Sequence, residues 1–77
     1  MRREKKPYVV MTFHTTEEAI AMETYGQKQG VKGRLIPVPG EISAGCGLCW
    51  RMEPETFGLF EERLKQVPHE TIVEIRM

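Results

Sequence analysis

Short apolar runs and two segments of helical periodicity alternate along this chain, in the order strand, helix, strand, strand, helix, strand. Residues 8–13 are continuously apolar and rich in β-branched and aromatic side chains, which predicts a central strand. Thr15 and Glu18 have the spacing of a capping box, in which each side chain satisfies a backbone N–H at the other position. We therefore expect a helix to begin there.

The helix predicted after Thr15 has an apolar face and a defined end. Four residues share that face at spacings of three and four: Ala19, Met22, Tyr25 and Gly26. Gly26 weakens the helix by about 1 kcal/mol relative to Ala but permits a sheet to approach closely. Gly30 suits the position after the last helical residue, and Val31 supplies the apolar contact of a Schellman stop.

Two further strands are predicted in the middle of the chain. Residues 33–38 form the first, and Pro37, which lacks a backbone donor, places it at a sheet edge or ends it. A connection follows at residues 39–45. The next strand is predicted at residues 46–52, and its side chains alternate between two faces. Cys46, Leu48, Trp50 and Met52 share one face, and Gly47, Cys49 and Arg51 share the other.

A second helix and a last strand complete the pattern. Pro54 suits the first turn of a helix. The apolar stripe of that helix consists of Phe57, Phe60 and Leu64. The last strand is predicted at residues 71–77, with Val73, Ile75 and Met77 facing inward and Glu74 and Arg76 facing outward.

This order of elements predicts an α+β fold of the ferredoxin-like β-α-β-β-α-β type, a four-stranded antiparallel sheet with both helices on one face. The 77 residues form one domain, 1–77, with a thin core and with residues 1–6 as a flexible basic N-terminus. The sheet face without helices favours a homodimer or a ligand there. We expect Trp50 to lie in the core or in a dimer interface.

The charge balance and hydropathy exclude several classes of partner. Eleven Lys and Arg balance eleven acidic residues, so there is no electrostatic reason to expect a nucleic acid. No apolar run approaches the ~20 residues that span a membrane, and the start of the chain lacks the apolar region of a signal peptide. These features predict a cytoplasmic protein, whose thiols are kept reduced.

Cys46 and Cys49 are the residues with the clearest chemical potential. Two sulfurs three positions apart can share a metal, close a small disulfide, or act as attacking and resolving thiols. In a regular strand their side chains point to opposite faces. They converge only if residues 45–47 form a turn or bulge, which Gly45 and Gly47 favour.

The surroundings of the pair suggest how a thiolate would be stabilised. Arg51 and Arg34 are candidate cations if the second and third strands pair, and Gly45 and Gly47 would present backbone N–H groups as an anion-binding nest. The glycines also leave Cys46 open to a partner's sulfur.

Two other interpretations of the cysteines stay open. A structural zinc needs four ligands, and His14 and His69 do not have zinc spacing, so a metal site would require a dimer that pools two thiol pairs. Alternatively, both cysteines are inert and the chain is an interaction domain. The residues themselves indicate no bound metal and no cofactor.

The segment Arg34-Leu35-Ile36-Pro37-Val38-Pro39, then Ile42-Ser43-Ala44-Gly45-Cys46-Gly47 and Arg51, resembles the putative selenium/sulfur carrier-like family of small bacterial domains. Phe13-His14-Thr15-Thr16 and Ala19 also fit, and the resemblance covers roughly residues 8–75. Gly45 replaces the Ser usual before the cysteine.

The resemblance implies a carrier rather than a turnover enzyme, with sulfur-donor and sulfur-acceptor proteins as partners. It implies that Cys46 holds a sulfur or selenium atom as a persulfide-type adduct, with Gly47 and Arg51 alongside. Cys49 lies outside the family's core pattern, and we expect it to act as the resolving thiol.

Overall fold

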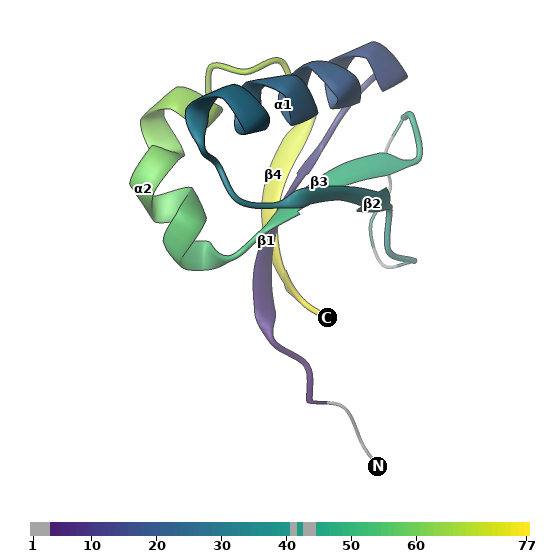
Figure 1. The fold of residues 1–77 in the computed structure, drawn as a ribbon. Helices are drawn as coiled ribbons and strands as arrows, with labels where there is room; N and C mark the ends of the chain where they lie inside the picture. Colours follow the sequence, from purple (N-terminus) through teal and green to yellow (C-terminus); the bar gives the residue numbers. More distant parts are fainter. Residues whose placement is uncertain (1–3, 41, 43–44) are drawn as a thin grey trace.

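The computed structural model describes residues 4–40, 42 and 45–77, and it contains the predicted elements in the predicted order. These are β1 (Pro7–Thr12), α1 (Thr16–Gln29), β2 (Arg34–Pro37), β3 (Leu48–Met52), α2 (Pro54–Leu64) and β4 (Thr71–Arg76). The strands form one antiparallel sheet in the order β2-β3-β1-β4, with both helices on one face (Figure 1). Because β3 lies between β1 and β2, the arrangement is a split βαβ, and the predicted fold class is confirmed.

Both ends of α1 form as the local sequence predicts. Thr15 is the N-cap, and its side-chain oxygen accepts the backbone N–H of Glu18 at 3.2 Å. The Glu18 carboxylate accepts the backbone N–H of His14 at 2.9 Å, one residue earlier than a capping box requires. At the other end Gly30 is left-handed, and the Val31 N–H donates to the Gly26 carbonyl at 2.9 Å, as in a Schellman motif.

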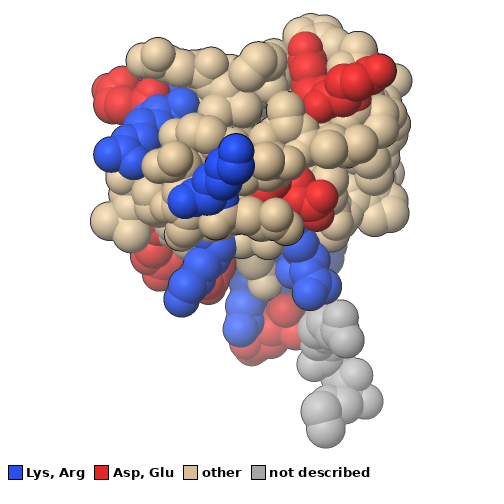
Figure 2. Space-filling model, turned by 45° about the horizontal axis from the view of Figure 1, so that its top comes forward, with Lys and Arg blue, Asp and Glu red and all other residues tan. Residues whose placement is uncertain are grey.

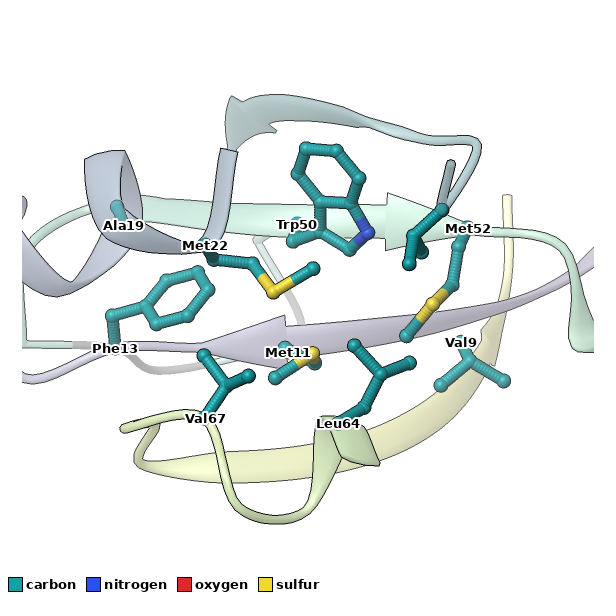
Figure 3. Packing of buried hydrophobic residues seen from close by; sticks show 10 residues of the cluster. Val9, Met11, Phe13, Ala19, Met22, Trp50, Met52, Leu64 and Val67 are labelled. Atoms are coloured by element: carbon teal, nitrogen blue, oxygen red, sulfur yellow. The ribbon is translucent and has the colours of Figure 1, made fainter. Parts of the chain in front are cut away.

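One apolar cluster fills the space between the helices and the sheet (Figure 3). Its members are Val9, Met11, Phe13, Ala19, Met22, Val31, Trp50, Met52, Leu64 and Val67. Trp50 is 2% exposed, which confirms its prediction as a core residue. A Cβ on Gly26 would lie 3.0 Å from the Trp50 ring, so a glycine there lets α1 approach β3 closely, as expected.

β4 has the opposite phase to the one predicted. Ile72 packs against the core cluster, whereas Val73 is 36% exposed on the face without helices. The register explains this difference, because Val73 pairs with Val10 and Ile72 pairs with Met11, whose side chain enters the core. Since β4 is an edge strand with partly exposed side chains on both faces, its alternation alone did not identify the core face.

Next to the sheet, the described segment before β1 pairs with the last residue of the chain. Lys6, the last residue of the segment predicted to be flexible, exchanges two backbone hydrogen bonds with Met77, at 3.0 and 2.9 Å. Residues 1–3 of that segment lie outside the described residues. Neither helix in the described part of the chain has the length and apolar character that crossing a membrane requires. On the face seen in Figure 2, basic and acidic side chains are interspersed.

Candidate functional site

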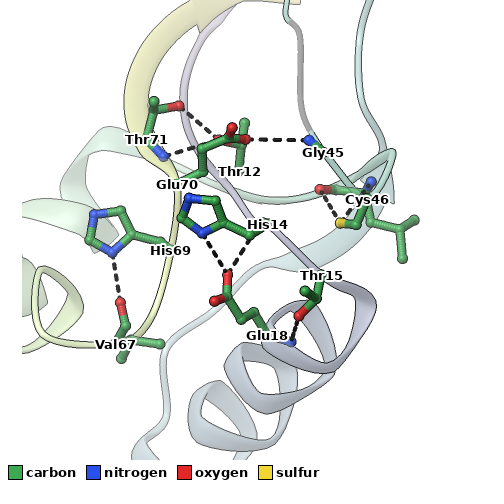
Figure 4. Close-up of polar contacts among 11 residues, drawn as sticks. Thr12, His14, Thr15, Glu18, Gly45, Cys46, Val67, His69, Glu70 and Thr71 are labelled. Carbon is green, nitrogen blue, oxygen red and sulfur yellow. Dashed lines mark hydrogen bonds and ion pairs between the residues drawn. The ribbon is translucent and has the colours of Figure 1, made fainter.

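Cys46 lies in a turn at the end of the sheet where β1 ends and β3 and β4 begin (Figure 4). The turn consists of Gly45, Cys46 and Gly47 and leads directly into Leu48, the first residue of β3. Ser43 and Ala44, which belong to the same predicted connection, lie outside the described residues. The predicted third strand, 46–52, is therefore shorter by two residues, and Cys46 is released from strand geometry.

The Cys46 sulfur contacts the backbone of the residue that follows its turn. The Leu48 N–H donates to Sγ at 3.4 Å, and the thiol lies 3.5 Å from the Leu48 carbonyl, which it can reach as a donor. Gly47 has a φ of 78°, the left-handed conformation that lets the chain fold back over the sulfur. Cys46 is half-buried and packs against the core cluster, so part of its surface remains open to a partner.

Contacts from other elements hold this turn in place. The Gly45 N–H donates to the Glu70 carboxylate at 3.3 Å. Glu70 is itself fixed, because its backbone N–H donates to the Thr12 carbonyl at 2.7 Å. A Cβ on Gly45 would lie 3.0 Å from the His14 carbonyl oxygen, so a glycine permits this close approach. The predicted backbone nest thus has its Gly45 N–H occupied by a carboxylate of the protein itself.

Cys49 lies inside β3, on the face of the sheet without helices. It pairs with Thr12 on β1 and Ile36 on β2, and it is fully buried. Burial raises the pKa of the Cys49 thiol, the neighbouring Cys46 raises it further, and the Arg51 charge lowers it in part. Cys49 is therefore a protonated and inaccessible thiol at neutral pH.

The two cysteines are close in the sequence but lie in different environments. Both are free thiols. Cys46 packs on the helix-covered side, whereas Cys49 points to the other face between its two neighbouring strands. The turn that would allow convergence is present, yet it directs Sγ of Cys46 toward Leu48. The role of Cys49 as resolving thiol stays a prediction, which requires the start of β3 to leave the sheet.

Arg51 and Arg34 do not lie beside the Cys46 turn. β2 and β3 do pair, as the argument for both cations required, and Arg34 is directly opposite Arg51. The Arg51 guanidinium lies over the Tyr8 ring, 4.7 Å from its centroid, on the face opposite the helices. The Arg51 charge lowers the pKa of Cys49, and the predicted part of Arg51 in binding the carried atom stays a prediction.

The histidines make local contacts. His14 lies 3.3 Å from the Glu18 carboxylate through Nδ1, and His69 Nδ1 lies 2.6 Å from the Val67 carbonyl. Within residues 4–40, 42 and 45–77, no group of three or more His, Cys, Asp or Glu side chains is placed to hold a metal ion. A thiolate site shared between two copies stays a prediction.

Glu70 is the residue of this site that the sequence analysis missed. It lies 25 positions from Gly45, so no local pattern connects them. The signal was topological: in the predicted antiparallel sheet, the residue before the last strand lies at the same end as the residues before β3.

Comparison with known proteins gives one match. The family described as putative Se/S carrier protein-like matches residues 8–75, nearly the whole chain. No curated protein and no solved structure matches the chain significantly.

Proposed function

Because the chain belongs to the putative Se/S carrier protein-like family, we propose that it carries sulfur or selenium on the thiol of Cys46. The observation that supports this assignment is the contrast between the two cysteines. Cys46 is partly exposed in a glycine turn, and Cys49 is sealed within the sheet. A relay between proteins needs a sulfur that a partner's sulfur can reach, and Cys46 meets that requirement.

Loading follows from ordinary thiol exchange. The Cys46 thiolate attacks the terminal sulfur of a donor protein's persulfide, a new S–S bond forms at Sγ, and the donor's S–S bond breaks. The donor cysteine leaves as a thiolate, so no external oxidant or reductant is needed. Transfer to an acceptor nucleophile reverses these roles and restores the Cys46 thiol. A selenium atom would follow the same exchange as a selenosulfide.

The turn supplies groups that suit this exchange. The Leu48 N–H points at Sγ and can remain hydrogen-bonded to an anionic sulfur. Gly47 adds no side chain to the turn, and apart from its chain neighbours no described residue has an atom within 4 Å of where its Cβ would be. On this proposal the chain is a carrier between donor and acceptor proteins in a reducing cytoplasm, rather than a turnover enzyme.

Intact-protein mass spectrometry after incubation with cysteine and a cysteine desulfurase tests the proposal. We expect the parent protein and Cys49→Ser to gain the mass of one sulfur, which a reductant removes. Cys46→Ser should gain none. Cys49→Ser is the matched control, because it removes the other thiol of the chain and leaves Cys46 in place.

Two outcomes would contradict the proposal. Equal loading of Cys46→Ser would assign the chemistry elsewhere. No loading of any form, together with slow alkylation of both thiols, would leave an interaction domain with inert cysteines. A carried sulfur that is released from the parent but persists on Cys49→Ser would support the predicted resolving role of Cys49.

A further inference from the structure

Two arginines stand side by side on the sheet face away from the helices. Arg34 on β2 is the direct cross-strand partner of Arg51 on β3, so both side chains project from the same face. Guanidinium groups keep their charge at any physiological pH. Like charges directly opposite each other in a sheet are destabilising, so folding alone does not account for this pair.

No carboxylate of the described residues forms an ion pair with either arginine. The ion pairs of the described chain are His14–Glu18 and Lys65–Glu61, both at helices. Arg51 instead lies over the Tyr8 ring, an interaction that orients the guanidinium but leaves its charge in place. Arg34 is exposed.

These charged side chains line a hollow of about 460 Å³. Its charged lining residues are Lys32, Arg34, Arg51 and Glu53, three cations against one carboxylate, and Tyr8 also lines it. The volume is in the range of small-molecule sites, about 300–1,000 Å³. The hollow cannot bury apolar ligand surface fully away from water, so a ligand would be held by charge and hydrogen bonds.

Gly33 builds the hollow by bringing β2 close to β3. A Cβ on Gly33 would lie 2.5 Å from the Arg51 carbonyl oxygen and 2.7 Å from the Trp50 ring. Only a glycine permits this approach. Lys32 and Arg34 flank Gly33, and both line the same hollow as Arg51.

We propose that the hollow formed by Lys32, Arg34, Arg51 and Tyr8 binds a phosphate-type oxyanion, either free or as the terminal group of a small metabolite. Two guanidinium groups can each donate paired N–H groups to such an anion, and the phenol of Tyr8 supplies a further donor. Bound anion would also remove the repulsion between Arg34 and Arg51. The hollow is on the face opposite the side on which Cys46 packs, so anion binding there does not require a sulfur on Cys46.

Titration with inorganic phosphate at constant ionic strength, followed by NMR of the arginine Nε–H signals, tests the site. We expect saturable shifts of the Arg34 and Arg51 signals. Arg34→Gln or Arg51→Gln should weaken binding by about tenfold or more, the effect of losing a charged hydrogen-bond donor. The matched control is Arg76→Gln, an exposed arginine on the far edge strand, which should change binding by less than about twofold.

Thermal unfolding gives a second reading that does not depend on NMR signals. In phosphate-free buffer Arg34→Gln should have a higher Tm than the parent protein, because the substitution removes a like charge. In saturating phosphate the parent protein should have the higher Tm of the two. A lower Tm for Arg34→Gln in phosphate-free buffer would overturn the argument from repulsion.

Glycerol 3-phosphate as a second probe distinguishes the two sources. Tighter binding of the ester identifies a metabolite site, and tighter binding of inorganic phosphate identifies a free-anion site. The absence of saturable binding by both, or equal weakening by Arg76→Gln, would overturn the proposal. Because Arg34→Gln should still load sulfur on Cys46, failure of one proposal is distinguishable from failure of the other.

Discussion

Gly47 sets the backbone conformation of the Cys46 turn. Its φ of 78° costs a residue with a Cβ about 1–2 kcal/mol, although no described residue beyond its chain neighbours lies within 4 Å of the added methyl group. Gly47→Ala should therefore lower the free energy of unfolding by about 1 kcal/mol, measured by urea unfolding. Gly58→Ala is the control, because its site is equally open but lies in α2, where Ala should raise stability by up to about 1 kcal/mol. The same sign for both would refute the assignment of strain.

The buried thiol of Cys49 links stability to pH. Burial raises its pKa, so above the ordinary value of about 8.5 the unfolded chain loses a proton that the folded chain retains. The stabilisation is complete below about pH 8.5 and is lost as the pH rises toward the folded pKa. Cys49→Ala should thus show a shallower fall in the free energy of unfolding between about pH 8 and 10 than the parent protein. Urea unfolding across that range measures it, and parallel profiles would contradict the linkage.

At the scale of elements, Gly33 joins β2 to β3. The Cβ of Gly33→Ala would meet the Arg51 carbonyl and the Trp50 ring, so β2 must shift outward. We expect a loss of about 1–3 kcal/mol in the free energy of unfolding, the usual cost of overpacking. Trp50 fluorescence during urea unfolding reports it directly. At Gly40 no described residue beyond the chain neighbours lies within 4 Å of an added Cβ, so Gly40→Ala should change stability little. A tolerated Gly33→Ala would show that β2 adapts without cost.

Features that depend on residues close together in the sequence were predicted correctly. The N-cap Thr15, the left-handed Gly30 and the first-turn Pro54 each act through neighbours within a few residues, so both ends of α1 and the start of α2 follow from the sequence. Pro37 likewise ends an edge strand. These interactions need no knowledge of the sheet.

Features that depend on strand pairing were not predicted. The face of Val73 is set by its register with Val10, which no pattern within β4 reveals. The separation of Cys46 from Cys49 depends on where β3 begins, and the contact of Gly45 with Glu70 depends on the sheet order. The two thiols are evident in the sequence, whereas the position of Arg51 beside Tyr8 and Arg34 depends on the strand register.

At the scale of the whole molecule, one core serves every element. Side chains of β1, α1, β3 and α2 form the cluster, and Leu35 of β2 and Ile72 of β4 pack against it. With no second cluster among the described residues to unfold separately, the domain should unfold in one transition. The total free energy of unfolding expected for a chain of this length is only about 4–12 kcal/mol. A single large truncation in the core therefore removes a substantial share of it.

Leu64 and Leu59 test this dependence within one helix. Leu64 is fully buried in the cluster, whereas Leu59 is 81% exposed. Leu64→Ala should lower the free energy of unfolding by about 2–5 kcal/mol, through lost apolar contact and the cavity left behind. Leu59→Ala changes the same side chain in α2 and should stay within about 0.5 kcal/mol of the parent protein. Far-UV circular dichroism and Trp50 fluorescence should give coincident urea transitions in both variants. If Leu64→Ala lost the fluorescence signal before the helical signal, α2 would not be part of a single cooperative core.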